Sequence, residues 1–231
     1  MPLLVGLGVW QLQRADYKQG LQDLYEQRSA ATAVGLSELS AEQDIAYLQI
    51  RLQGRFDNEH HFLLDNRVLN GRVGYEVISP FLLEPAITNQ SGDVFDLIWI
   101  NRGWIPMLAS RNELPEIKPV VQSIELNGQL VNPSDTFVLA DVPLSGQWPE
   151  VVQRIDLLQM TKRLSGVQAQ GEARQIAPYL FRAAVGQAGS FQINWQAINT
   201  SPQKSLGYSV QWFLMALVLT GLYFWTCIRQ K

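Results

Sequence analysis

The segment Leu206–Ile228 runs for 23 residues without a charged side chain, and Arg229 and Lys231 follow it. At about 1.5 Å rise per residue, a helix of this length measures roughly 34 Å, which is enough to cross the hydrocarbon core of a bilayer. Aromatic rings that prefer the headgroup boundary stand near both ends, namely Tyr208, Trp212, Tyr223 and Trp225. A core helix of a soluble protein rarely runs this far without a charged face. We therefore expect a C-terminal transmembrane helix over residues 205–228.

The chain also begins apolar, from Met1 to Trp10. This stretch is too short to span a bilayer, so it is either the end of a first transmembrane helix, truncated here, or the remnant of a signal segment. We favour the truncated helix, over residues 1–10, because the stretch has no charged leader and no small-residue cleavage site. An apolar stripe then continues at helical spacing, through Tyr17, Leu21, Leu24 and Tyr25.

Residues 11–204 have the composition of one globular domain with a helical lead-in. Strand patterns dominate: apolar and polar residues alternate in YLQIRLQGRF, and Asn70–Gly71 between HHFLLDNRV and GYEVISPFLL is typical of a tight hairpin turn. DLIWINRGWIP, QSIELNGQLV and GSFQINWQAI are read as further strands. One internal helix is expected over Val151–Leu164, with Ile155, Leu158 and Met160 facing the core. The predicted fold is an α+β membrane protein whose mainly antiparallel β domain lies between two helices.

Charge and composition argue against several functions. The net charge is −3 and the basic residues are scattered, so the chain lacks the basic surface that nucleic acid requires. The single cysteine, Cys227, excludes an intrachain disulfide. The two histidines, His60 and His61, are adjacent, and on a strand they point to opposite faces, which does not suit one metal ion.

The sequence contains no nucleophile elbow, no glycine-rich phosphate loop and no Cys-x-x-Cys copper site. We therefore predict no catalytic residues, no metal site and no enzymatic activity.

Three clusters combine polar and aromatic residues: Asp65, Asn66 and Arg67; Asn101, Arg102, Gly103 and Trp104; and Asn194 with Trp195. One interpretation is turn chemistry beside a packed ring. The other is ligand or partner binding, since the guanidinium groups of Arg67 and Arg102 offer planar donor forks for a carboxylate or a propionate. The residues alone do not decide between these interpretations.

Four ordered blocks carry a resemblance to a known family: LGVWQLQRADYK, LLDNRVLNGRVGYEVISPF, INRGWIPMLASRNELP and LGYSVQWFLMAL. They cover the chain from Trp10 to Trp212 and resemble the Surfeit locus protein one family, assembly factors of haem-copper cytochrome c oxidase. The resemblance implies two transmembrane helices that hold the domain on the periplasmic or intermembrane-space side, with residues 229–231 as a cytoplasmic tail. The absence of a transit-like start favours a bacterial inner membrane, with the mitochondrial inner membrane as the alternative if the source is eukaryotic.

By the same resemblance the partners are oxidase subunit I and the haem a synthesis machinery, and the role is to insert haem a or to stabilise subunit I. Bacterial relatives hold haem a through a histidine in the pattern His-Leu-Gly-Tyr-Ala-x-Gln-Trp. This chain has Ser205 at that position, and a serine hydroxyl is a poor axial ligand for haem iron. Haem a as a cofactor would therefore need another ligand, of which Tyr208 is chemically possible, or the site has been lost, by divergence or by engineering.

Gln211 and Trp212 still match the pattern, and an amide in an apolar helix favours contact with the other helix or with a partner. If the helices pair, Trp10, Arg14 and Trp212 are expected near one another at the outer interface. Three functions stay open: a non-catalytic oxidase assembly factor, a haem a carrier with a different ligand, and a generic envelope scaffold or hydrolase.

Overall fold

The computed structural model describes residues 2–40, 43–111, 113–132, 144–167, 175–197 and 200–229. It has an α+β fold, as predicted, and it divides into two compact units. One is the domain Arg28–Asn194, and the other joins Met1–Gln27 to Trp195–Lys231.

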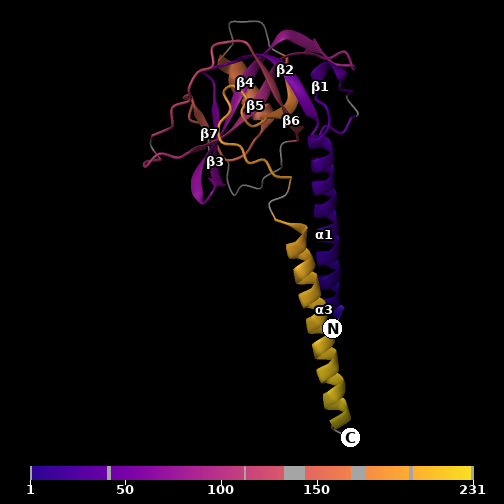
Figure 1. Ribbon diagram of the computed structural model, residues 1–231. Coiled ribbons are helices and arrows are strands. Elements are labelled where there is room, and N and C mark those ends of the chain that lie inside the picture. Colours follow the sequence, from indigo (N-terminus) through magenta and orange to yellow (C-terminus); the bar gives the residue numbers. More distant parts are fainter. Residues whose placement is uncertain are drawn as a thin grey trace. The chain divides into compact units, whose positions relative to one another are not determined.

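The domain is built on one eight-stranded sheet (Figure 1). Its strands are β1 (Val34–Gly35), β2 (Gln49–Phe56), β3 (Phe62–Leu69), β4 (Arg72–Thr88), β5 (Val94–Pro106), β6 (Ile124–Val131), β7 (Glu150–Val152) and β8 (Ile176–Ala183), with a short 3-10 turn η1 (Leu36–Glu38) after β1. The strand order is β1-β2-β6-β8-β5-β4-β3-β7, and β2 also pairs with β4. Strands β2, β6, β8, β5 and β4 therefore close into a barrel-like ring.

Most neighbouring strands are antiparallel, as expected, but β1–β2, β3–β7 and β5–β8 are parallel. The hairpin between β3 and β4 is confirmed: Leu69 pairs with Arg72, and Asn70 and Gly71 between them have φ of 50° and 75°. Positive φ at both central residues matches the right-handed strand twist, which explains the Asn-Gly pair.

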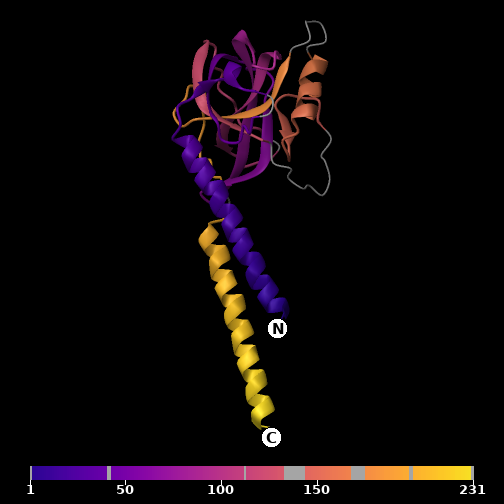
Figure 2. The same ribbon diagram turned by 90° about the vertical axis from the view of Figure 1, so that its right-hand side faces the viewer.

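Two apolar clusters hold the domain together. The first contains buried residues from all five strands of the ring, among them Ile50, Phe81, Ile98, Leu126 and Phe181. The second packs helix α2 (Leu157–Val167) against the sheet and includes Phe62, Trp99, Met160 and Leu164. Figure 2 shows α2 on one flank of the sheet.

Helix α2 corrects the expected helix at its start. Val151 and Val152 belong to strand β7, and the helix begins only at Leu157. Met160 is buried as expected, but Leu158 is 66% exposed, so its predicted core position is wrong. The segment GSFQINWQAI is also not a strand, because its pairing is limited to an isolated bridge between Gln192 and Trp104 in the described residues.

The second unit contains helices α1 (Pro2–Ser29) and α3 (Pro202–Arg229), which run antiparallel. Small side chains allow a close approach: Gly8 and Ala15 are buried on α1, and a Cβ added at Gly8 would lie 2.7 Å from the ring of Phe213 on α3. Among the described residues, α3 alone is long and apolar enough to cross a membrane. The assignment of residues 1–10 to a membrane span stays a prediction.

Candidate functional site

Two of the three polar-aromatic clusters meet on strands β3, β4 and β5. Asn101 on β5 donates from Nδ2 to Oε2 of Glu76 on β4 at 2.7 Å, and its Oδ1 accepts the backbone N–H of Gly103 at 3.1 Å. The other carboxylate oxygen of Glu76 lies 3.7 Å from Nε of Arg67 on β3. Asn101 is fully buried and Arg67 is partly exposed, so this network connects the core to the surface.

Trp104 joins the same network through its ring. The indole Nε1 donates to the backbone oxygen of Arg67 at 2.9 Å. The ring packs on Gly74, where an added Cβ would collide with the indole and with the carbonyl of Ile105. Gly103 has φ of +108°, which L side chains rarely adopt, so both glycines are needed for Trp104 to take this position.

Asn66 marks a bulge at the edge of the network. The register between β3 and β4 shifts between Leu64 and Arg67, and Asn66 has φ of 58°. Asp65 stabilises the bulge by accepting the backbone N–H of Asn66 at 2.7 Å, and its other oxygen lies 3.1 Å from Nη1 of Arg111. Asn66 is therefore explained by a local backbone conformation, as the turn interpretation expects.

Glu76 is the member of this network that sequence reasoning missed. Tyr75 and Val77 on either side of it are buried, and Glu76 itself is half-buried. A carboxylate inside a buried strand needs hydrogen-bonding or ionic partners. The position of Glu76 in an apolar strand was therefore the sequence feature that indicated polar partners such as Arg67 and Asn101.

Arg102 points away from the network and is 1% exposed. Its Nε donates to the carbonyl of Gly189 at 2.7 Å, and its guanidinium carbon lies 4.4 Å from the ring centroid of Phe56 and 4.9 Å from that of Phe191. No carboxylate in the described residues pairs with it, and burial lowers its pKa to about 10. Arg102 therefore anchors a loop and does not present its guanidinium to a carboxylate ligand at the surface.

The two histidines have separate environments. His60 Nδ1 lies 2.7 Å from Oδ2 of Asp57, whereas His61 is 4% exposed and its Nδ1 lies 2.8 Å from Oγ of Ser79. Burial, and secondarily the charge of Arg102, lowers the pKa of His61 to about 4. No group of three potential metal-ligating side chains occurs in the described part of the chain.

His61 predicts a specific pH dependence of stability. Its pKa is about 4 in the folded state against 6.5 for an unperturbed histidine, so between these values the unfolded state binds more protons. The free energy of unfolding should fall by about 2.5 kcal/mol from this group as the pH drops from about 7 to about 4.5. Denaturant unfolding at both pH values measures this loss. In the His61→Gln variant, the decrease in the free energy of unfolding between the two pH values should be about 2.5 kcal/mol smaller than in the wild type. Equal losses in the two proteins would contradict the assignment.

Ser205, at the position of the family histidine, lies inside the helix pair. It is 3% exposed, and Lys18 Nζ on α1 donates to its Oγ at 3.1 Å and to Oγ1 of Thr200 at 2.7 Å. Ser209, one turn further, is 1% exposed. A buried serine hydroxyl that is hydrogen-bonded to a lysine does not fit an axial haem ligand. Tyr208 does not complete such a site, because it is 54% exposed on another face of α3.

The other family positions on the helices have mixed environments. Gln211 is exposed, so the expectation that it faces the first helix is wrong, and contact with a partner stays a prediction. Trp212 is half-buried on α3. On α1, Trp10 is 49% exposed, and the guanidinium carbon of Arg14 lies 5.4 Å from its ring centroid.

Trp195 lies apart from the network, in the helical unit. Its backbone oxygen accepts a hydrogen bond from the hydroxyl of Tyr25 at 3.4 Å. The two residues line a pocket of about 360 Å³ together with Gln22, Glu26, Gln196, Ala197 and Ser201. Of the third cluster, Trp195 therefore belongs to the junction of the two helical segments, whereas Asn194 is the last residue of the domain unit.

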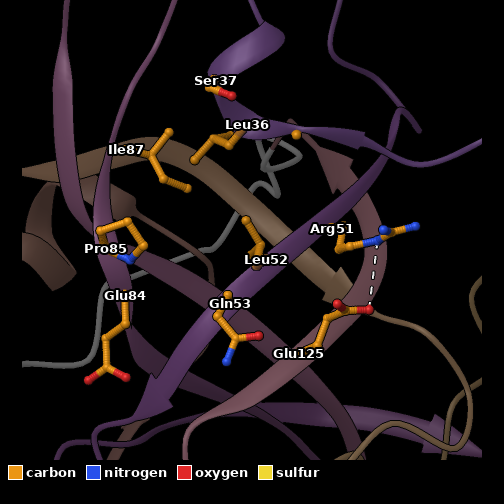
Figure 3. Close-up of a pocket in the computed structure, with 10 residues that line it drawn as sticks. Leu36, Ser37, Arg51, Leu52, Gln53, Glu84, Pro85, Ile87 and Glu125 are labelled. Atoms are coloured by element: carbon orange, nitrogen blue, oxygen red, sulfur yellow. Dashed lines mark ion pairs between the residues drawn. The ribbon is translucent and has the colours of Figure 1, made fainter.

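A second pocket, of about 190 Å³, lies on the domain where β2 leaves β1 and begins to pair with β4 (Figure 3). Leu36, Leu52, Pro85 and Ile87 form its apolar floor, and the ion pair of Arg51 with Glu125, at 3.7 Å, lies at its rim. The pocket is smaller than typical small-molecule sites, and its charged groups have ion-pair partners: Arg51 pairs with Glu125, and Glu84 pairs with Arg55 outside the pocket at 3.1 Å. It lacks the convergent polar groups of a catalytic centre.

The comparison with protein families agrees with the four sequence blocks. No individual curated protein matches the chain significantly. The model of the SURF1 family, the Surfeit locus protein one family, matches residues 1–217, which include the whole domain, α1 and the first half of α3. The chain therefore belongs to the SURF1 family, which is linked to the assembly of cytochrome oxidase.

Proposed function

We propose that this protein is a membrane-anchored assembly factor that stabilises subunit I of haem-copper cytochrome c oxidase while haem a is inserted. The observation that carries the proposal is the family match over residues 1–217. The apolar helix α3 supports an anchor in the inner membrane. By family analogy the domain lies on the periplasmic side of a bacterial membrane, or in the intermembrane space if the source is eukaryotic.

The chemistry of the network supports a role without turnover. The Glu76 carboxylate and the Asn101 amide are bonded to each other, the Trp104 indole donates to the backbone oxygen of Arg67, and Asn101 uses both ends of its amide inside the protein. The network contains no nucleophile next to a general base. The partly exposed Arg67 and the exposed Arg111, which pairs with Asp65 beside the network, are the groups available for polar contacts with an oxidase subunit.

The role that we propose does not include axial ligation of haem iron at residue 205. The Lys18–Ser205 contact stabilises the helix pair at that position. The Ser205 hydroxyl accepts a hydrogen bond from the Lys18 ammonium group, and this contact favours packing between the helices over coordination of a metal. The haem a synthesis machinery is then a functional neighbour, and subunit I is the direct partner.

The test is complementation of a bacterial host that produces a haem a oxidase and lacks its own family member. We expect expression of this chain to restore oxidase activity and the haem a absorbance of the membranes, because the protein supports subunit I. The double variant Arg67→Ala, Arg111→Ala should restore less, at an equal amount of membrane-bound protein. The purified chain should carry far less than stoichiometric haem. Full membrane insertion without any gain in oxidase would contradict the proposal.

A further inference from the structure

The pocket of about 360 Å³ that contains Tyr25 and Trp195 lies entirely within the helical unit. Helix α1 contributes Gln22, Tyr25 and Glu26 to its lining, and the segment that leads into α3 contributes Trp195 and Ser201, among others. The volume falls within the range of about 300 to 1,000 Å³ that is usual for small-molecule sites. The pocket is therefore large enough to hold a small ligand or the polar end of a larger one.

Two contacts between the helices set the level of this pocket relative to the apolar segment of α3. Gly8 of α1 lies against Phe213, and Lys18 donates to Oγ of Ser205. Ser205 directly precedes the uncharged run Leu206–Ile228, so residue numbers on α1 rise in the direction away from that run. The pocket residues of α1 lie about 6 to 12 Å beyond Lys18, at about 1.5 Å rise per residue. When α3 spans a bilayer, the pocket therefore begins in the headgroup layer, which extends about 5 to 7 Å beyond the hydrocarbon core.

Charges of opposite sign follow one another along α1 at this level. The ammonium group of Lys18 donates to Thr200 at 2.7 Å and to Ser205 at 3.1 Å, which leaves one of its three N–H groups for a further acceptor. Two turns further out is the exposed carboxylate of Glu26, whose Oε1 accepts the side-chain amide of Gln22 at 2.9 Å. No lysine or arginine in the described part of the chain pairs with this carboxylate. The order outward from the apolar segment is positive and then negative.

A zwitterionic phospholipid carries its charges in the complementary order. Its phosphate adjoins the glycerol and the acyl chains, and its ammonium group stands at the outer end of the headgroup. Lys18 is then at the level of the phosphate, and Glu26 is at the level of the ammonium group. The rings of Tyr25 and Trp195 add aromatic faces, which attract cations, at a depth where these residue types are enriched in membrane proteins. An anionic headgroup without an ammonium group leaves Glu26 without a partner.

We propose that this pocket binds the headgroup of a zwitterionic phospholipid with a primary ammonium group, the chemistry of phosphatidylethanolamine, from the membrane that holds α3. A primary ammonium group donates three hydrogen bonds. The second carboxylate oxygen of Glu26 and the side-chain carbonyls of Gln22 and Gln196 are acceptors for them. A bound headgroup contacts both helical segments and so links α1 to the start of α3. The inference rests on the membrane anchoring contained in the proposed function and adds a specific lipid to it.

Lipid retention tests the site. The full chain is reconstituted into vesicles of equal parts phosphatidylethanolamine and phosphatidylglycerol with matched acyl chains and is then released in a mild detergent. Native mass spectrometry counts the lipid molecules that stay bound. We expect phosphatidylethanolamine to be retained in excess over phosphatidylglycerol. Glu26→Gln should lower that retention about fivefold, the effect of losing one partly exposed charge contact.

Asp23→Asn is the matched control. Asp23 is exposed on the same helix and accepts the side-chain amide of Gln19 at 2.7 Å, just as Glu26 accepts that of Gln22, but it does not line the pocket. Its change should leave the retention of both lipids unaltered, although it removes the same charge from the same surface.

Two further variants identify the chemistry of recognition. Glu26→Lys should reverse the preference, because the new ammonium group attracts the anionic headgroup of phosphatidylglycerol and repels that of phosphatidylethanolamine at its outer end. Trp195→Leu keeps apolar volume and removes the aromatic face, so it should lower the retention of phosphatidylethanolamine without reversing the preference.

The outcomes separate the two proposals. Equal retention of the two lipids by the unaltered chain, or equal losses in Glu26→Gln and Asp23→Asn, overturns the headgroup site and leaves the anchored assembly factor intact. Free O-phosphoethanolamine should compete only weakly in detergent, and if it binds as tightly as the lipid, the membrane is not the source of the ligand and the proposal fails. Extraction of the chain from membranes by alkaline carbonate overturns the anchoring, and the lipid site with it.

Discussion

Replacing Arg102 by alanine should lower the free energy of unfolding by about 3 to 5 kcal/mol, since it removes a large buried side chain and leaves polar groups without a donor. The carbonyl of Gly189 loses its 2.7 Å hydrogen bond, and Phe56 and Phe191 lose the group that packs between them. Denaturant unfolding of the detergent-solubilised chain, followed by far-ultraviolet circular dichroism, measures the loss.

Arg102→Lys and Arg72→Ala are the matched controls. Lysine keeps the charge but lacks the planar donor fork, so Arg102→Lys should still cost about 1 to 3 kcal/mol. Arg72 is exposed at the hairpin, and its change to alanine should stay within about 0.5 kcal/mol of the wild type. A wild-type stability for Arg102→Ala would mean that the guanidinium does not anchor the loop.

Trp104→Ala should also cost about 3 to 5 kcal/mol, because the ring is 6% exposed and fills the space that Gly74 leaves open. The change also has an expected local effect. The indole hydrogen bond to the backbone oxygen of Arg67 is lost, so Arg67 and its contact with Glu76 should become less ordered. Backbone amide exchange at residues 65–68 reports this change.

Trp104→Phe separates the ring from its N–H group. Phenylalanine fills most of the volume and removes only the 2.9 Å bond to the Arg67 carbonyl, so the expected loss is about 1 to 2 kcal/mol. If Trp104→Phe destabilises the chain as much as Trp104→Ala, the indole hydrogen bond and not the volume of the ring determines the contribution of Trp104. If neither variant changes exchange at residues 65–68, the connection from Trp104 to Arg67 is wrong.

The parts of the fold that local chemistry dictates were predictable from the sequence. Alternation of apolar and polar residues located β2, because one face of that strand packs into the ring and the other faces solvent. The Asn70–Gly71 pair located the β3–β4 hairpin, because its backbone requires positive φ at two consecutive residues.

The errors have physical causes in the tertiary structure. In GSFQINWQAI the alternating residues Phe191 and Ile193 do pack onto the domain, but over the described residues 189–197 pairing is limited to the single bridge at Gln192. The alternation therefore reflects burial of these side chains and not a strand of the sheet. Strand β8 was overlooked because Pro178 interrupts its pattern, although β8 pairs with β5 and β6 in the ring. The start of α2 was misplaced because Val151 and Val152 pair with β3.

The candidate site was predictable as a set of residues but not as an arrangement. Asn101 and Trp104 were identified by type, and their connection to Arg67 exists only because β3, β4 and β5 are neighbours. Arg102 has the same local sequence context as Asn101, yet it points to the other side of the strand and is buried against aromatic rings. In the sequence, the opposite orientation of Asn101 and Arg102 is indicated only by the alternation of side chains between the two faces of a strand.

Closure of the ring leaves the domain few free strand edges. The sheet ends at β1 and β7, strands of two and three residues, so each longer strand has neighbours on both sides over at least part of its length in the described structure. Exposed strand edges are templates for pairing with unfolded polypeptide. The open edges are then the two short strands and the end of β3 beyond Leu64, which β7 does not accompany. For the assembly factor that we propose, so few open edges would limit pairing with unfolded polypeptide.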